Sequence, residues 1–198
     1  MIASLPQVLL LLEIGAVVMI LLYMFYAAKQ QAIAWLFGIA ASVLSVFLFY
    51  FQHYWGSLFL NLVYCVQGIL GYLNWKFVLE GKSIRQNLNL PLQMLAIAIL
   101  SFLGYQVYQY VIKNTSIELN VFDCMLAAIS IYATWLEVKK EMACWNIWIL
   151  ANLSYAVLYF VNATSGNMYL YAALMLFLAV FSLKAKRAWQ ASLSESKS

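Results

Sequence analysis

Charge is what this sequence has least of. Only 9% of its 198 residues are charged, 66% are hydrophobic, and the mean hydropathy is +0.86. A soluble domain carries about 25% charged residues, so this chain has too little polar surface to cover a water-facing globule. Its apolar surface is expected to face lipid, and the sequence therefore predicts an integral membrane protein.

Residues suited to metal binding and catalysis are also scarce. His53 is the only histidine, and the three cysteines, Cys65, Cys124 and Cys144, show no CxxC spacing. A metal site needs several convergent His, Cys or carboxylate ligands, and an enzyme needs a nucleophile with a base beside it. We therefore expect no metal, no cofactor and no enzymatic activity.

Proline and glycine are few, with 2 and 8 residues, which favours long, unbroken helices. The N-terminus lacks the basic region and the cleavage site of a signal peptide, so we expect the first apolar stretch to be retained as a helix. Crossing the hydrocarbon takes about 20 apolar residues. Seven stretches qualify: Pro6–Ala28, Ile33–Phe51, Ser57–Phe77, Leu90–Ile112, Val121–Val138, Ala143–Val161 and Met168–Leu183.

The basic residues lie almost entirely on one side of these spans. If the N-terminus is outside, ten of the eleven Lys and Arg residues fall on the inner side and only Lys113 on the outer side. Because basic residues are held on the cytoplasmic side, a multi-pass chain with an outer N-terminus and an inner C-terminus is predicted. The charges are spread over four short segments, so nucleic-acid binding is not expected.

The first three spans resemble the last three when the sequence is shifted by 110 residues. A lysine, a tryptophan and an acid then coincide: Lys29 with Lys139, Trp35 with Trp145 and Glu13 with Asp123. Four extra residues in the second half would also align Trp75 with Trp189. Such matches at equivalent places in the helices indicate an internal duplication.

The duplication predicts an all-α fold with two parallel three-helix repeats and one linking helix. Each repeat has an odd number of helices, so the linking helix keeps both repeats in the same orientation. The predicted parts are a first repeat over residues 1–77, a linking helix over 90–112, a second repeat over 121–189 and a disordered cytoplasmic tail over 192–198. This 3-1-3 plan matches one transporter architecture, in which the substrate site lies between the halves. A duplicated membrane scaffold is the alternative.

Polar and aromatic side chains within the membrane are concentrated in the third and sixth spans. They cost free energy there unless they face a cavity or one another. Trp148 and Asn152 are four residues apart, so an indole could stack on a flat ring while the amide binds the ring's edge. The predicted substrate-binding residues are Trp148, Asn152, Asn61, Tyr64, Gln67 and Tyr155. The alternative is that the amides only hydrogen-bond neighbouring helices.

Acids are absent from the middle of every predicted span, since Glu13, Asp123 and Glu137 lie near helix ends. An aromatic cage without a buried counter-charge suits a flat, delocalised cation. A proton relay or a sodium site would need a central carboxylate, so transport is expected to be uncoupled. Three further tryptophans near inner helix ends are expected to be interfacial anchors: Trp35, Trp75 and Trp145.

Both halves resemble the PnuC family of bacterial vitamin transporters, which have a 3-1-3 arrangement related to the SWEET sugar transporters. In the first half the resemblance rests on the runs Trp35–Ile39 and Gly71–Trp75. In the second half it rests on Trp145–Asn152, where Trp148 and Asn152 form the family's Trp-x-x-x-Asn motif.

The resemblance implies facilitated diffusion of a vitamin or its nucleoside across the bacterial inner membrane, with phosphorylation by a cytoplasmic kinase trapping the substrate. Members handle nicotinamide riboside, thiamine or riboflavin. Met175 stands where riboside-type members carry Tyr. A thioether wall offers a ribose fewer hydrogen-bond partners, which favours thiamine over nicotinamide riboside. A non-transporting scaffold or receptor is the alternative of another class, and a homo-oligomer is left open.

Overall fold

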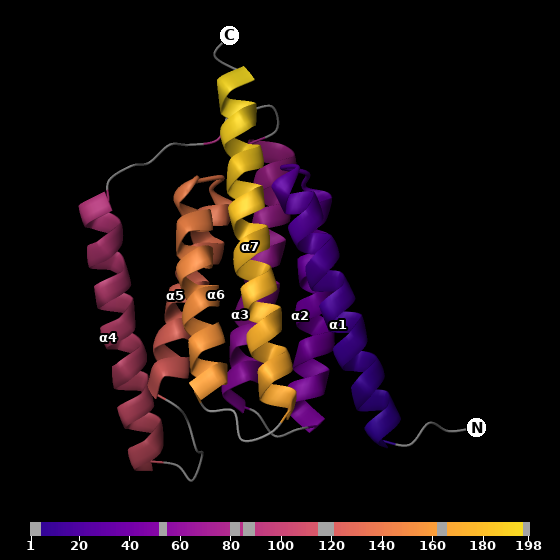
Figure 1. The fold of residues 1–198 in the computed structure, drawn as a ribbon, viewed down its shortest axis with the longest axis vertical. Coiled ribbons are helices and arrows are strands. Elements are labelled where there is room, and N and C mark those ends of the chain that lie inside the picture. Colours follow the sequence, from indigo (N-terminus) through magenta and orange to yellow (C-terminus); the bar gives the residue numbers. More distant parts are fainter. Residues whose placement is uncertain are drawn as a thin grey trace. The chain divides into compact units, whose positions relative to one another are not determined.

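The computed structural model describes residues 5–51, 55–79, 84, 90–114, 121–161 and 166–195. Figure 1 shows that the regular elements in these ranges are helices. They are α1 (Leu5–Ala28), α2 (Ile33–Phe51), α3 (Trp55–Leu73), a π-helical turn η1 (Asn74–Val78), α4 (Leu90–Asn114), α5 (Val121–Val138), α6 (Ala143–Val161) and α7 (Gly166–Glu195). The prediction of an all-α protein with seven long helices is confirmed.

Five helices of the described chain are long and apolar enough to cross a membrane. These segments are Pro6–Ala28, Ile33–Phe51, Ser57–Val78, Met94–Val111 and Ala143–Val161. A shorter apolar stretch, Met125–Val138, lies in α5. The chain is therefore a multi-pass membrane protein, as predicted.

The seventh helix is longer than predicted. It ends at Glu195, whereas the sequence predicted a span ending at Leu183 and a disordered tail from Ser192. Ala, Lys, Arg and Gln are good helix formers, so the helix continues beyond its apolar part. The tail prediction is wrong up to Glu195, while residues 196–198, His53 and most of the predicted connections lie outside the described residues.

Internal contacts divide the chain into two compact units, Met1–Ser83 with Ala188–Ser198, and Ile84–Arg187. The first unit holds α1, α2, α3 and the last turns of α7, and the second holds α4, α5, α6 and the rest of α7. In the first unit α2 packs against both α1 and α3, and in the second α5 packs against both α4 and α6. The bounds of the two three-helix repeats stay a prediction.

Aromatic rings form the centre of the first unit. The Trp35 ring lies edge-on to Tyr23 and Trp75, with centroids 5.7 and 5.4 Å away. The Trp75 ring lies 5.9 Å from the ring of Trp189. A Cβ at Gly71 would overlap the Trp35 ring, so glycine is needed for the close approach of α3 to α2 at this point.

The inner-end tryptophans are core residues, and their prediction as interfacial anchors is wrong. Trp35, Trp75 and Trp145 are only 2%, 2% and 1% exposed. An interfacial anchor keeps its ring at the boundary between lipid and water. Position along a span is readable from the sequence, but the direction in which a ring points depends on the packing of neighbouring helices.

The last turns of α7 bind the turn between α1 and α2. The Trp189 indole Nε1–H donates to the backbone carbonyl of Ala27 at 3.0 Å, and the Gln30 Nε2 amide donates to Ser192 Oγ at 2.8 Å. Trp189 is fully buried. These two contacts between residues far apart in the sequence complete the first unit.

The turn between α1 and α2 recurs between α5 and α6. In the first turn the N–H of Gln31 donates to the carbonyl five residues earlier at 3.0 Å, which is the bond that closes a Schellman motif. Glu141, 110 residues later, makes the same bond at 2.9 Å. The preceding residues, Gln30 and Lys140, have left-handed φ angles of 57° and 52°. This shared geometry supports the proposed duplication.

Candidate functional site

One face of α6 carries the predicted aromatic and amide groups. Asn152 lies one turn after Trp148 and is 6% exposed, while Trp148 is half-buried. Tyr155 is half-buried on the same face and stacks on Tyr159, with ring centroids 5.9 Å apart and an interplanar angle of 19°. The structure thus brings three of the six predicted residues together on one side of a single helix.

Glu137 makes a contact that its position near a helix end does not predict. The Trp148 indole Nε1–H donates to Glu137 Oε2 at 3.0 Å, and the Glu137 side chain is fully buried. It does lie near the end of α5, as predicted, but the expectation that the predicted aromatic residues have no buried acid beside them is wrong. Distance from a helix end says little about burial, because the neighbouring helix and turn cover this position.

The end of α5 and the turn after it carry several buried ionisable side chains. Glu137, Lys140 and Glu141 are 0%, 6% and 8% exposed. Lys140 lies outside the helical spans, and burial lowers the pKa of its ammonium group. The backbone N–H of Lys140 donates to the carbonyl of Glu137 at 2.9 Å, so the two residues are held one turn apart. The same positions of the first turn, Ala27 and Gln30 among them, carry no charge.

The other predicted residues lie on α3, in the first unit. Asn61, Tyr64 and Gln67 follow one another at three-residue steps, with Gln67 buried and the other two half-buried. The Asn61 Nδ2 amide donates to the carbonyl of Ser57 at 2.8 Å within the same helix. That bond fits the alternative in which the amide satisfies its own surroundings. The prediction that Asn61, Trp148 and Asn152 line one cavity stays a prediction.

Metal ligation has no support within the described residues, where no group of three His, Cys, Asp or Glu side chains is placed to hold an ion. Other buried hydroxyls of the second unit are used locally. Ser130, Thr134 and Ser182 each donate to a carbonyl of their own helix, at 2.8, 3.0 and 2.8 Å. Such bonds are the usual way to bury a hydroxyl in a membrane helix. The indole, amide, phenol and carboxyl groups of α5 and α6 are the candidates for contact with a ligand in this part of the chain.

The described chain has seven long helices, and five of them are apolar enough to span a membrane. The protein is therefore a polytopic helical membrane protein, and one of its helices carries a polar and aromatic face. The chain belongs to the nicotinamide mononucleotide transporter family, whose sequence pattern matches residues 10–191. The resemblance to PnuC proteins is thereby confirmed.

A solved structure supports the fold. The chain is similar to the vitamin B3 transporter PnuC, with 21% sequence identity and a TM-score of 0.70. The similarity covers 93% of this chain and 82% of that one. No curated protein sequence matches the chain significantly.

Proposed function

We propose that this chain transports a flat, positively charged vitamin of the vitamin B3 type by facilitated diffusion, with nicotinamide riboside as its substrate. The observation that carries the proposal is the match to the nicotinamide mononucleotide transporter family over residues 10–191. The solved protein with a similar fold is a vitamin B3 transporter. Transport rather than catalysis is the function proposed for the site.

The comparisons favour nicotinamide riboside, which was the alternative in the sequence analysis, over thiamine. The preference for thiamine rested on Met175, which is half-buried in α7. A thioether is soft and adaptable, and it packs against the ring of either vitamin. One such residue does not decide the substrate.

The charges on α3 and α6 favour the riboside over the mononucleotide. Neither helix contains a lysine or an arginine within its bounds, Trp55–Leu73 and Ala143–Val161. A phosphate group is bound in proteins through charge-assisted hydrogen bonds from Arg, Lys or a helix N-terminus. A neutral ribose needs only uncharged partners, and Asn61, Tyr64 and Gln67 are of that kind.

The proposed roles follow from the chemistry of the side chains. Trp148 stacks on the pyridinium ring, and Asn152 hydrogen-bonds the carboxamide at the ring's edge. Tyr155, stacked on Tyr159, extends the aromatic wall. The substrate moves down its gradient and is then phosphorylated by a cytoplasmic kinase, which traps it in the cell.

Uptake into liposomes that contain only this protein tests the proposal. We expect labelled nicotinamide riboside to equilibrate across the membrane, while labelled thiamine and nicotinamide mononucleotide enter no faster than into protein-free liposomes. Entry of thiamine alone would overturn the choice of substrate. Entry of none of the three would favour a scaffold or receptor instead.

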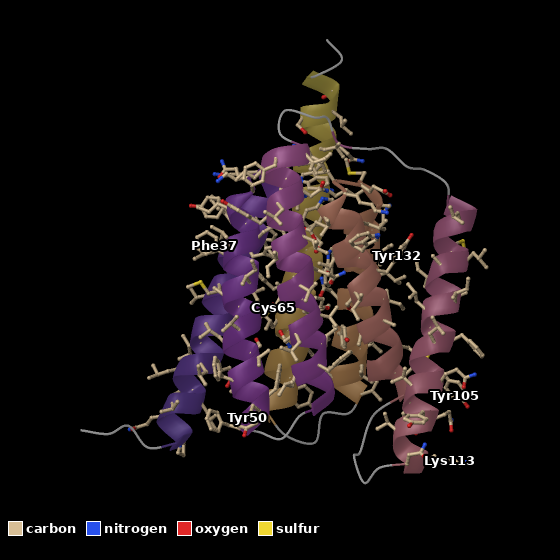
Figure 2. The ribbon with its side chains drawn as sticks, turned by 180° about the vertical axis from the view of Figure 1, so that it is seen from behind. Phe37, Tyr50, Cys65, Tyr105, Lys113 and Tyr132 are labelled. Carbon is tan, nitrogen blue, oxygen red and sulfur yellow. The ribbon has the colours of Figure 1, made fainter. Side chains whose placement is uncertain are left out.

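We also propose that the chain lies in a bacterial inner membrane with its N-terminus outside. The support is the distribution of basic residues along the sequence, in which this orientation leaves only Lys113 outside. Figure 2 shows Lys113 at the end of α4. Ser194 is exposed near the end of α7 and suits a reporter cysteine in a variant that lacks Cys65, Cys124 and Cys144. Ser194→Cys should resist impermeant thiol reagents in intact cells and react after lysis. Labelling in intact cells would reverse the proposed orientation.

A further inference from the structure

We propose that Glu137 determines specificity at the substrate site, because it holds the Trp148 ring in place and supplies a negative charge that favours a cationic substrate. The inference rests on the proposed function, in which Trp148 stacks on the substrate. It adds a residue of α5 to the proposed ligand-binding face of α6 that carries Trp148, Asn152 and Tyr155.

The hydrogen bond fixes the indole. A tryptophan side chain has a single donor, Nε1–H, and in Trp148 that donor lies 3.0 Å from Glu137 Oε2. Glu137 is fully buried, so its carboxylate has no solvent into which it could turn. Trp148 itself is only half-buried. One edge of the ring is therefore held by the protein, while part of the ring's surface is exposed.

Comparison of the two halves shows that Glu137 and Trp148 occur as a pair, because neither has a counterpart of its type in the first half. With the 110-residue shift, Glu137 corresponds to Ala27 and Trp148 to Gly38. The first unit thus lacks both members of the pair, although it keeps the same turn. A carboxylate needed only for the turn would be expected in both halves, so its presence beside the indole alone points to a role at the site.

In each unit one helix of the hairpin carries a large aromatic residue and its neighbour carries a small one. The large residue is on the first helix of one hairpin and on the second helix of the other. A Cβ at Gly38 would lie 3.1 Å from Cδ2 of Tyr23, so the Tyr23 ring occupies that region in the first unit. The residue that corresponds to Tyr23 in the second unit is Ala133, which is completely buried and lies one turn before Glu137. The small residue on α5 leaves room for the large one on α6.

The charge of Glu137 acts on the substrate through the ring and through space. A carboxylate that accepts the indole N–H polarises the ring and makes its face a better partner for a cation. In a site of low dielectric the negative charge itself also attracts a pyridinium. A neutral ligand of the same shape gains from neither effect, so Glu137 should separate cationic from neutral substrates.

Calorimetry on the purified full chain in detergent tests this role with two ligands of nearly equal shape. Nicotinamide riboside is a cation, and its reduced dihydropyridine form is neutral. Glu137→Gln keeps an oxygen that can accept the indole N–H and removes the charge. We expect this variant to bind the cation about tenfold more weakly, equivalent to about 1.4 kcal/mol, and the neutral form within about twofold of wild type.

Glu141→Gln is the matched control. Glu141 is a second buried carboxylate, and both it and Glu137 act electrostatically on Cys144, but the Trp148 indole donates its hydrogen bond to Glu137. We expect the ratio of the two affinities to stay within about twofold of wild type in this variant. An equal loss in Glu141→Gln would overturn the specific role of Glu137, because any nearby charge would then serve.

A measurement without substrate tests the positioning. The ultraviolet resonance Raman difference between the wild type and Trp148→Phe isolates the indole N–H band of Trp148. Glu137→Ala should move that band to the position of a weaker hydrogen bond, and Glu137→Gln should not. An unmoved band in Glu137→Ala overturns the positioning role.

The binding results also separate this inference from the proposed function. Wild-type protein that binds neither compound overturns both. Wild-type protein that binds both, together with an unchanged affinity ratio in Glu137→Gln, overturns the role of Glu137 and leaves the proposed function standing.

Discussion

The hairpins α1–α2 and α5–α6 share the geometry of their turn. They differ in the size of the side chains on one face of the helix that follows it. On α2 the face consists of small residues, Gly38, Ser42 and Ser45, and both serines are buried. The corresponding positions of α6 carry the large polar and aromatic residues of the candidate site, Trp148, Asn152 and Tyr155. One copy of the duplicated hairpin serves close packing of helices, and the other presents groups able to bind a ligand.

The two hairpins share the geometry of the backbone connection but differ in the volume of the side chains that follow it. The left-handed residue of the turn is Gln30 in one hairpin and Lys140 in the other, although glycine is the residue that adopts this conformation most readily. Because the turn is fixed by backbone hydrogen bonds, charge can differ at single positions around it. Ala27 and Gln30 are neutral, whereas the corresponding Glu137 and Lys140 are ionisable.

The largest effect is expected when the tryptophan of the second unit is introduced at the corresponding position of the first unit. Gly38→Trp should lower the free energy of unfolding by about 3 kcal/mol, because the new ring would meet the Tyr23 ring. Adding Tyr23→Ala should recover at least half of the loss by restoring the arrangement of the second unit. Thermal unfolding in detergent measures both changes, with Tyr23→Ala alone as the control. A double variant no more stable than Gly38→Trp would contradict the exchange of large and small residues between the helices.

A smaller effect is expected at the candidate site. Trp148→Ala should weaken binding of nicotinamide riboside by about 1–2 kcal/mol, which is the contribution of a desolvated cation–π contact. Titration calorimetry gives the change directly. Trp135→Ala is the control, since this tryptophan of α5 is 39% exposed and its ring contacts Lys139 at 5.0 Å. Equal losses in the two variants would remove the reason for placing substrate on Trp148.

Trp189 offers a milder test of the first unit. Trp189→Phe keeps an aromatic ring beside Trp75 but removes the donor to the Ala27 carbonyl. The unfolding free energy should fall by about 1 kcal/mol, the usual net contribution of a buried hydrogen bond, with some further loss from the smaller ring. Trp135→Phe, at an exposed position, should change it by less than about 0.5 kcal/mol. Equal effects would show that this bond does not stabilise the unit.

No effect at all is expected from ion gradients. At zero membrane potential, imposing a proton or sodium gradient on liposomes should leave the final substrate distribution equal on both sides. The proposal that transport is uncoupled is sharper now that Glu137 is known to be buried beside Trp148. Accumulation under a proton gradient would contradict it. Loss of that accumulation in Glu137→Gln, with Glu13→Gln as the control, would then identify the coupling residue.

Local and periodic features were predictable from the sequence. Long apolar runs gave the seven helices, and the four-residue spacing of Trp148 and Asn152 placed both on one face of α6. The extent of α7 was missed because its last turns are polar, and polar residues with high helix propensity continue a helix without any apolar signal.

The burial of individual side chains could not be predicted from the sequence. Glu137 and Trp35 both lie near helix ends, and both were read by that position alone. Their burial depends on which neighbouring helix covers them, and hydropathy carries no information on that. The shift of 110 residues held a usable signal, since Glu137 replaces Ala27 where Trp148 replaces Gly38. Paired changes between repeats indicate contact more directly than the hydropathy of either residue.

The bond from Trp189 to the Ala27 carbonyl also bears on the order in which the protein is completed during synthesis. Helices α1, α2 and α3 leave the ribosome first, but the residues that close their unit, Trp189 and Ser192, are made only after α6 and most of α7. Until then the ring of Trp75 lacks the second of its two tryptophan neighbours, and the Ala27 carbonyl accepts from the backbone N–H of Gln30 but not yet from an indole. The unit that is inserted into the membrane first is thus the one that must wait for the end of translation to finish folding.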